Sequence, residues 1–203
     1  MNIFISGIGG LGLIGLSKRM CGMLETLYPS VLSSENRGIA QRRGHISATL
    51  RAGSSTHTPR LVNGKVDLLI ALEALEALKH PELIGPNTLC IVSDLKMKNF
   101  GGNQTKHGYP PMEQIVQRLN QLGAQVIVVE YEQFMLDNQL LKVHISSAIL
   151  GVFSRLFKFT EDELQQLYPK LFKDARNNAA LNWGYQLFDF NQEQQCQVHP
   201  IAA

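Results

Sequence analysis

Six residues near the start of the chain have the spacing of a turn that binds a diphosphate. They are Gly7-Ile8-Gly9-Gly10-Leu11-Gly12, a G-x-G-x-x-G pattern between a β-prone run and a helical one. Glycines lack Cβ atoms and let a phosphate approach the backbone, and the free N–H groups at a helix start attract an anion. The pattern therefore predicts an anion site, with a tight turn needed only for packing as the alternative.

A carboxylate stands where a dinucleotide-binding protein would need one. Glu35 ends a predicted strand 23 positions after Gly12, and in such proteins an acid at this place receives the ribose hydroxyls. A P-loop does not fit, because no Lys-Ser/Thr pair follows a second glycine at the required spacing. A nicotinamide dinucleotide is therefore one candidate ligand.

The segment after Glu35 is basic and contains glycines. Arg37, Arg42 and Arg43 lie within seven residues, and guanidinium groups capture phosphate or carboxylate by paired hydrogen bonds. Residues 1–60 carry seven Lys/Arg and two Glu, whereas the remainder carries twelve basic and fifteen acidic residues. An anionic ligand is thus expected in the N-terminal third, with a solvated basic loop as the alternative. Nucleic acid is not expected, because no basic face with interleaved aromatics extends beyond this segment.

Residues that would carry out a reaction are not evident, so the chain is expected to hold a ligand without owning the reactive groups. The six histidines show no H-x-x-x-H or H-E-x-x-H spacing, so we predict no metal site. The three cysteines, Cys21, Cys90 and Cys196, form no C-x-x-C pair, which argues against a cluster or a disulfide framework and for a reducing compartment. We see no secretory signal and no apolar run that could span a membrane, and expect a cytoplasmic protein.

Hydrophobic periodicity predicts the elements that position these motifs. Strands are expected at residues 2–6, 30–35, 45–52, 66–72, 88–93 and 125–130, and helices at 13–27, 73–80, 112–122, 145–157 and 172–188. Thr160 and Glu163 form a capping box that starts one more helix. This order predicts an α/β, Rossmann-like fold with a mainly parallel sheet covered by helices and a helical C-terminal extension.

The elements also suggest how the chain is divided. We expect residues 2–35 to form one βαβ unit and residues 94–111 to form a long loop that docks a partner. A single Rossmann-like domain is predicted over residues 1–190, helical from about 143, followed by a loose tail over 191–203.

Several motifs together resemble the gamma domain of the 2-oxoacid:ferredoxin oxidoreductases (the pyruvate/ketoisovalerate oxidoreductase gamma family), most closely its indolepyruvate oxidoreductase beta subunits. The family's G-x-G-G-Q-G matches residues 7–12, and its S-E-x-H-G-M-A-Q-R-G-G matches Ser34 to Gly44. Its A-D-x-L-L-A-F-E-x-L-E-A-L resembles the segment that ends in Glu73-Ala74-Leu75-Glu76-Ala77-Leu78, and Arg51 matches an arginine at a strand end.

The resemblance implies a subunit that assists thiamine-dependent oxidative decarboxylation of a 2-oxoacid to an acyl-coenzyme A. Thiamine diphosphate and iron–sulfur clusters would lie on a partner alpha subunit, with ferredoxin as electron acceptor and a heteromeric complex as the working form. The glycine turn would help to seat coenzyme A. The residues implied to bind it, with Glu35 added from the strand pattern, are Gly7, Gly9, Gly10, Leu11, Gly12, Gln41 and Arg42.

The chain departs from the family pattern at three positions. Leu11, Arg37 and Arg43 stand where the family has Gln, His and Gly. Leu11 lacks the donor and acceptor of a Gln, and the two arginines could recognise a more anionic ligand. A self-sufficient NAD(P)-dependent reductase and a noncatalytic regulatory or binding module are the competing interpretations.

Overall fold

The computed structural model describes residues 1–37, 44–54, 56–97 and 108–195; for residues 37 and 188–195 it describes the backbone alone. The predicted ligand residues Gln41 and Arg42 lie outside the described residues, as do most of the predicted loop at 94–111 and the end of the predicted tail. The chain forms two compact units, residues 1–146 and 147–203, and each is described by itself. The single domain over 1–190 stays a prediction.

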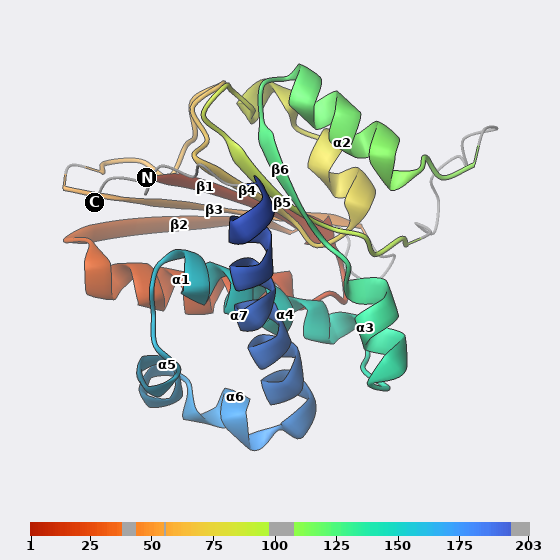
Figure 1. Ribbon diagram of the computed structural model, residues 1–203. Helices are drawn as coiled ribbons and strands as arrows, with labels where there is room; N and C mark the ends of the chain where they lie inside the picture. The colour runs from red at the N-terminus through yellow and green to blue at the C-terminus, as the bar shows by residue number, and fades with distance from the viewer. Residues whose placement is uncertain (38–43, 55, 98–107, 196–203) are drawn as a thin grey trace. The chain divides into compact units, whose positions relative to one another are not determined.

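A six-stranded sheet forms the centre of the first unit (Figure 1), in the order β2-β3-β1-β4-β5-β6. Its strands are β1 (Asn2–Ile8), β2 (Ser30–Arg37), β3 (His45–Gly53), β4 (Leu68–Ala71), β5 (Leu89–Ser93) and β6 (Gln125–Val129). The pairs β1–β4, β4–β5 and β5–β6 are parallel, whereas β3 is antiparallel to both β1 and β2. The predicted α/β class with a mainly parallel sheet is confirmed.

The βαβ unit expected over residues 2–35 is interrupted by another strand: β1 and β2 run parallel and are joined by α1, and β3 inserts between them. β3 pairs along its length with both strands, and Ala48 aligns with Ile5 of β1 on one side and Glu35 of β2 on the other. Its strict alternation of apolar and polar residues suits a strand paired on both sides with one polar face. Glu35 therefore lies two strand spacings, about 10 Å, from β1.

Helical elements cover the two faces of the sheet (Figure 1). Helix α1 (Leu13–Leu27) packs along β1, β2 and β3 with a buried stripe that includes Leu16, Met20 and Leu24. Helix α2 (Met112–Gln121) covers the other face and adds Ile115 and Leu119 to a core cluster with strand residues of β1, β4 and β5. Apolar residues at helical spacing bury one side of each helix, which is what holds it on the sheet.

The helix expected over residues 73–80 is instead a pair of short 3₁₀ turns, η2 (Ala74–Leu78) and η3 (Pro81–Leu83). The Glu73 side chain caps the start of η2, and the Ala74 N–H donates to Leu95 O at 3.0 Å. The backbone bonds here span three residues, as in a 3₁₀ helix: Glu76 N donates to Glu73 O at 3.1 Å and Lys79 N to Glu76 O at 3.4 Å. Pro81, which has no N–H to donate, follows closely. A short helix α3 (Tyr131–Asp137) and a 3₁₀ turn η4 (Lys142–His144) follow β6 and were not predicted.

The C-terminal part is helical, as predicted. It contains α4 (Ile145–Leu156), α5 (Glu161–Leu167), α6 (Pro169–Lys173) and α7 (Ala175–Gln195), which runs past the predicted end at residue 188. The predicted capping box is present: Thr160 Oγ1 accepts from Glu163 N at 3.3 Å, and Glu163 Oε2 accepts from Thr160 N at 2.7 Å. Of the helices in the described structure, none is both long and apolar enough to pass through a bilayer.

Two glycines let α4 and α7 approach closely within the second unit. A Cβ built on Gly184 would lie 1.9 Å from Ala148 O, and one on Gly151 would lie 2.1 Å from Leu181 O. Backbone contact of this kind leaves no space for any side chain. The two helices are therefore packed through their backbones.

We expect Gly184→Ala to lower the free energy of unfolding by about 3 kcal/mol, the upper end for an overpacked core, because the helices must move apart. Gly15→Ala is the matched control, since a Cβ there meets only the flexible end of Arg19 at 3.3 Å. That variant should gain up to about 1 kcal/mol from helix propensity. Urea unfolding followed by circular dichroism measures both, and equal effects of the two variants would contradict the proposed helix contact.

Candidate functional site

The predicted glycine turn joins β1 to α1 and is anchored by backbone hydrogen bonds. Gly9 N donates to Gly44 O at 3.1 Å, which ties the turn to the residue before β3, and Leu11 N donates to Ile8 O at 3.3 Å. Gly10 and Gly12 have φ values of 98° and 78°, in the left-handed region that favours glycine. The backbone of the turn thus favours glycine at both positions.

The space around the turn differs between its two strained glycines. A Cβ on Gly12 would lie 2.7 Å from Ser146 Oγ, so this position is closed by packing. Among the residues that the structure describes, a Cβ on Gly10 would meet nothing within 4 Å, and Gly10 is exposed. A ligand therefore has room beside Gly10.

The N-terminus of α1 carries a partial positive charge that attracts such a ligand. Its N-cap is Gly12, which provides no side-chain cap, and its first turn contains no acidic residue. The first N–H groups of a helix have no partner within the helix and carry its positive end. The backbone beside Gly10 is accordingly suited to a phosphate group.

The structure brings some of the predicted ligand residues together and separates others. Leu11 as a whole is 1% exposed, and its N–H already donates to Ile8 O, so neither its side chain nor its N–H is open to a ligand. A Cβ on Gly7 would lie 3.2 Å from Leu13 Cδ1 and 3.3 Å from Leu72 Cβ, which indicates a packing role. Glu35 lies on β2, two strands from the turn. The cofactor-binding roles of these residues stay predictions.

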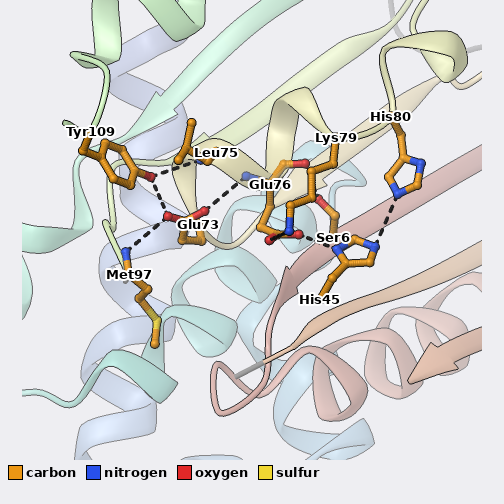
Figure 2. A network of polar contacts seen from close by, with 9 residues as sticks. All are labelled: Ser6, His45, Glu73, Leu75, Glu76, Lys79, His80, Met97 and Tyr109. Carbon is orange, nitrogen blue, oxygen red and sulfur yellow. Dashed lines mark hydrogen bonds and ion pairs between the residues drawn. The ribbon is translucent and has the colours of Figure 1, made fainter. Parts of the chain in front are cut away.

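A buried network of polar and charged side chains lies where β1 and β3 meet the glycine turn (Figure 2). The Glu76 carboxylate is 1% exposed and contacts His45 Nδ1 and Lys79 Nζ, each at 2.5 Å. The Glu76 carbonyl also accepts from Ser6 Oγ at 3.0 Å. His45 follows Gly44, and Ser6 lies two residues before the end of β1. The network therefore holds both strands at the place where the turn begins.

A second buried carboxylate lies beside the first (Figure 2). Glu73 accepts from Tyr109 Oη at 2.5 Å, Met97 N at 3.2 Å and Glu76 N at 3.2 Å. Burial raises the pKa of Glu73, and burial with the Glu73 contact raises that of Tyr109. Met97 and Tyr109 flank residues 98–107, so this one carboxylate fixes both ends of that segment.

Two histidines meet at the edge of the network. His45 Nε2 lies 3.3 Å from His80 Nε2, and His80 Nδ1 lies 3.1 Å from Glu82 Oε1. The sequence predicted no metal site, because the six histidines lack H-x-x-x-H and H-E-x-x-H spacing, and no contact was predicted between these two, which lie 35 residues apart. Across the described ranges, no group of three or more His, Cys, Asp or Glu is placed to hold a metal ion.

Glu73 and Glu76 belong to the segment that resembles the family motif A-D-x-L-L-A-F-E-x-L-E-A-L, but no role was predicted for either residue. Their spacing of three residues in an otherwise apolar run was the available signal, since buried acids need partners. A large groove of about 940 Å³ lies elsewhere, lined by residues of α2, β6 and α3, among them Glu113 and Glu132, and by Asp94, which follows β5. No residue of the glycine turn lines it.

Comparison with known proteins gives a consistent family match. The model described as pyruvate ferredoxin/flavodoxin oxidoreductase matches residues 2–187. The indolepyruvate oxidoreductase subunit IorB of Archaeoglobus fulgidus is 30% identical over 129 residues, and that of Methanothermobacter thermautotrophicus is 30% identical over 125 residues. These matches span 64% and 62% of this chain and 64% and 63% of the relatives, so the aligned part is a little under two thirds of their length.

Solved structures share the fold at low identity. The 2-oxoglutarate:ferredoxin oxidoreductase from Magnetococcus marinus, solved with 2-oxoglutarate, coenzyme A and succinyl-CoA bound, has a TM-score of 0.68 at 19% identity, covering 94% of this chain and 31% of its own. The pyruvate oxidoreductase subunit PORC from Thermotoga maritima has a TM-score of 0.63 at 16% identity, covering 92% of this chain and 95% of its own.

Replacing Glu73 by Gln tests the buried carboxylate. Because the folded pKa of Glu73 is raised, the folded state holds its proton more tightly than the unfolded state, and its contribution to stability falls as pH rises. We expect the free energy of unfolding of the wild type, relative to Glu73→Gln, to decrease from about pH 4 to pH 8. Urea unfolding across that range measures it.

The exposed α2 residue Glu113 supplies the control. Glu113→Gln removes one carboxylate from the surface, and its pH dependence relative to the wild type should not show the same fall. A wild type that runs parallel to Glu73→Gln at every pH would contradict a buried, raised-pKa carboxylate at residue 73.

Proposed function

The chain belongs to the pyruvate ferredoxin/flavodoxin oxidoreductase family, and from this premise we propose that it is a gamma-type subunit of a 2-oxoacid:ferredoxin oxidoreductase. Its role in that complex is to hold a phosphate-bearing cofactor while a partner subunit carries out the oxidative decarboxylation. The observation that carries this proposal is the glycine turn with its uncapped helix start and the open space at Gly10.

Coenzyme A is the ligand that this turn suits best in such a complex. The solved Magnetococcus marinus relative contains coenzyme A, which when bound supplies the thiol that accepts the acyl group. In this chain, the N–H group of Gly10 itself and those in the first turn of α1 would bind a phosphate of the cofactor, since the N–H groups of Gly9 and Leu11 already donate to backbone carbonyls. Gln41 and Arg42 would add side-chain donors next to the turn, as the family motif implies.

A partner must supply the redox centres. The sequence has three cysteines, fewer than the four thiolates that hold one iron–sulfur cluster. Burial raises the pKa of Cys90 to about 12, which keeps this thiol protonated. We therefore place thiamine diphosphate and the clusters on an alpha subunit, with ferredoxin as electron acceptor, and the relatives at 30% identity favour an indolepyruvate-type substrate. The cytoplasm is the expected location of this complex.

The competing NAD(P)-dependent reductase is less well supported by the fold. A dinucleotide-binding sheet places the acidic strand next to the first strand, where its carboxylate reaches the ribose. Here β3 separates Glu35 from β1 by one whole strand. The other alternative is a regulatory module that makes no catalytic contribution. Reconstitution of the complex with and without this chain separates it from the proposed subunit, because adding a regulatory module of this kind would leave the turnover of the partner unchanged.

The turn can be tested with a pair of variants at the same position. Gly10→Asp adds a carboxylate at the proposed phosphate site, and Gly10→Asn adds a neutral side chain of the same shape. Both residues are among those tolerated at positive φ, so the backbone cost is shared. We expect coenzyme A to bind the assembled complex at least about tenfold more weakly with Asp than with Asn.

Isothermal titration calorimetry measures this difference, and NADH and NADPH are titrated in parallel. Equal dissociation constants for the Asp and Asn variants would place the anion elsewhere. Binding of NADH without coenzyme A would favour the reductase.

Isolation of the chain from its native host tests the partner. We expect a large subunit containing thiamine diphosphate and iron–sulfur clusters to copurify, identified by mass spectrometry and by iron and thiamine analysis. The isolated chain should show no 2-oxoacid oxidation, and turnover should appear with both subunits present. Copurification of no such subunit would contradict the proposal.

A further inference from the structure

The contact between His45 and His80 is unusual in its geometry (Figure 2). The two Nε2 atoms face each other at 3.3 Å, with ring centroids 5.3 Å apart. His45 begins β3, and His80 lies between η2 and η3, so the fold brings the two rings together from distant parts of the chain. Both side chains are about one third exposed, at 27% and 32%, and can be reached from solvent.

The other nitrogen of each ring is held by a carboxylate. His45 Nδ1 contacts Glu76 Oε2 at 2.5 Å, and His80 Nδ1 contacts Glu82 Oε1 at 3.1 Å. An ionised carboxylate only accepts, so each Nδ1 must carry the hydrogen. In neutral rings, both Nε2 atoms then present lone pairs to each other. This arrangement is favourable when either a metal ion or a proton lies between them.

A metal ion of the zinc type fits this separation. Zinc binds histidine nitrogen at about 2.0–2.1 Å with tetrahedral angles, which places two such nitrogens about 3.3 Å apart. Histidines that bind metal almost always donate their second N–H to a carboxylate or carbonyl, which fixes the ring and its tautomer. Both features are present here.

We propose that His45 and His80 bind a divalent transition-metal ion through their Nε2 atoms, with Glu76 and Glu82 orienting the rings. Since the described residues offer no group of three acids, thiols and histidines, the remaining positions on the ion are taken by water or by an incoming ligand. This site does not depend on coenzyme A or on the proposed oxidoreductase role.

The surroundings leave room for those further ligands. A hollow of about 360 Å³ is lined by His80 and Glu82 together with the hydroxyl residues Ser34, Thr49 and Thr58. Thr49 Oγ1 is buried in the structure without a hydrogen-bond partner.

The test uses the full chain without a histidine tag and measures Zn²⁺ binding by calorimetry. We expect one Zn²⁺ per chain, bound at least about tenfold more weakly by His80→Gln and by His45→Gln. Glu82→Gln should weaken binding by about tenfold or more, as loss of a supporting carboxylate does at metal sites. His57→Gln, which removes an exposed histidine outside the pair, should bind Zn²⁺ as the wild type does.

A shared proton is the competing explanation of the contact, and nuclear magnetic resonance of the imidazole nitrogens separates the two. Zn²⁺ should shift the Nε2 signals of His45 and His80 together and leave that of His57 unchanged. Zn²⁺ binding by His80→Gln at wild-type affinity, or Nε2 signals that respond to pH but not to Zn²⁺, would overturn the proposal. Circular dichroism confirms that each variant is folded.

Discussion

The buried carboxylate of Glu76 is the constraint on which the candidate site depends. A charge removed from water is tolerated only with partners, and this one has His45 from β3 and Lys79 from the end of η2. Its backbone carbonyl also accepts from Ser6 of β1. Three segments far apart in sequence are thereby fixed where the parallel strands end. Loss of either partner would leave the buried carboxylate with a single side-chain partner, which costs more than the lost contact itself.

The position of the glycine turn depends on these contacts of Glu76. Gly9 donates to the carbonyl of Gly44, and Gly44 immediately precedes His45. The other side of the turn is fixed by close packing of Gly12 against Ser146. With both sides held, the open backbone at Gly10 is presented in one conformation. A preorganised turn of this kind binds an anion without a further cost for ordering the loop.

Sequence patterns were sufficient for the fold class and most of its elements, and insufficient for strand order. Buried runs such as residues 68–71 and alternating ones such as 45–53 carry local signals of strand type, but pairing partners depend on contacts far along the chain. That is why β3 was not placed between β1 and β2. The glycine turn was visible because its chemistry lies in consecutive residues. The meeting of His45 with His80 was not, because no local spacing reports on residues brought together by tertiary structure.

The two candidate ligand sites are connected through a single peptide segment. Gly44 contributes its carbonyl to the anion-binding turn, and the next residue, His45, faces His80. An ion that fixed the His45 ring would therefore also restrict the backbone of Gly44 and, through it, the amide of Gly9. A phosphate at the turn and a cation at the histidines carry opposite charges, so their electrostatic interaction is attractive rather than competing. The two proposed ligands would therefore place charges of opposite sign at the ends of β1 and β3, the strands that the Glu76 contacts fix.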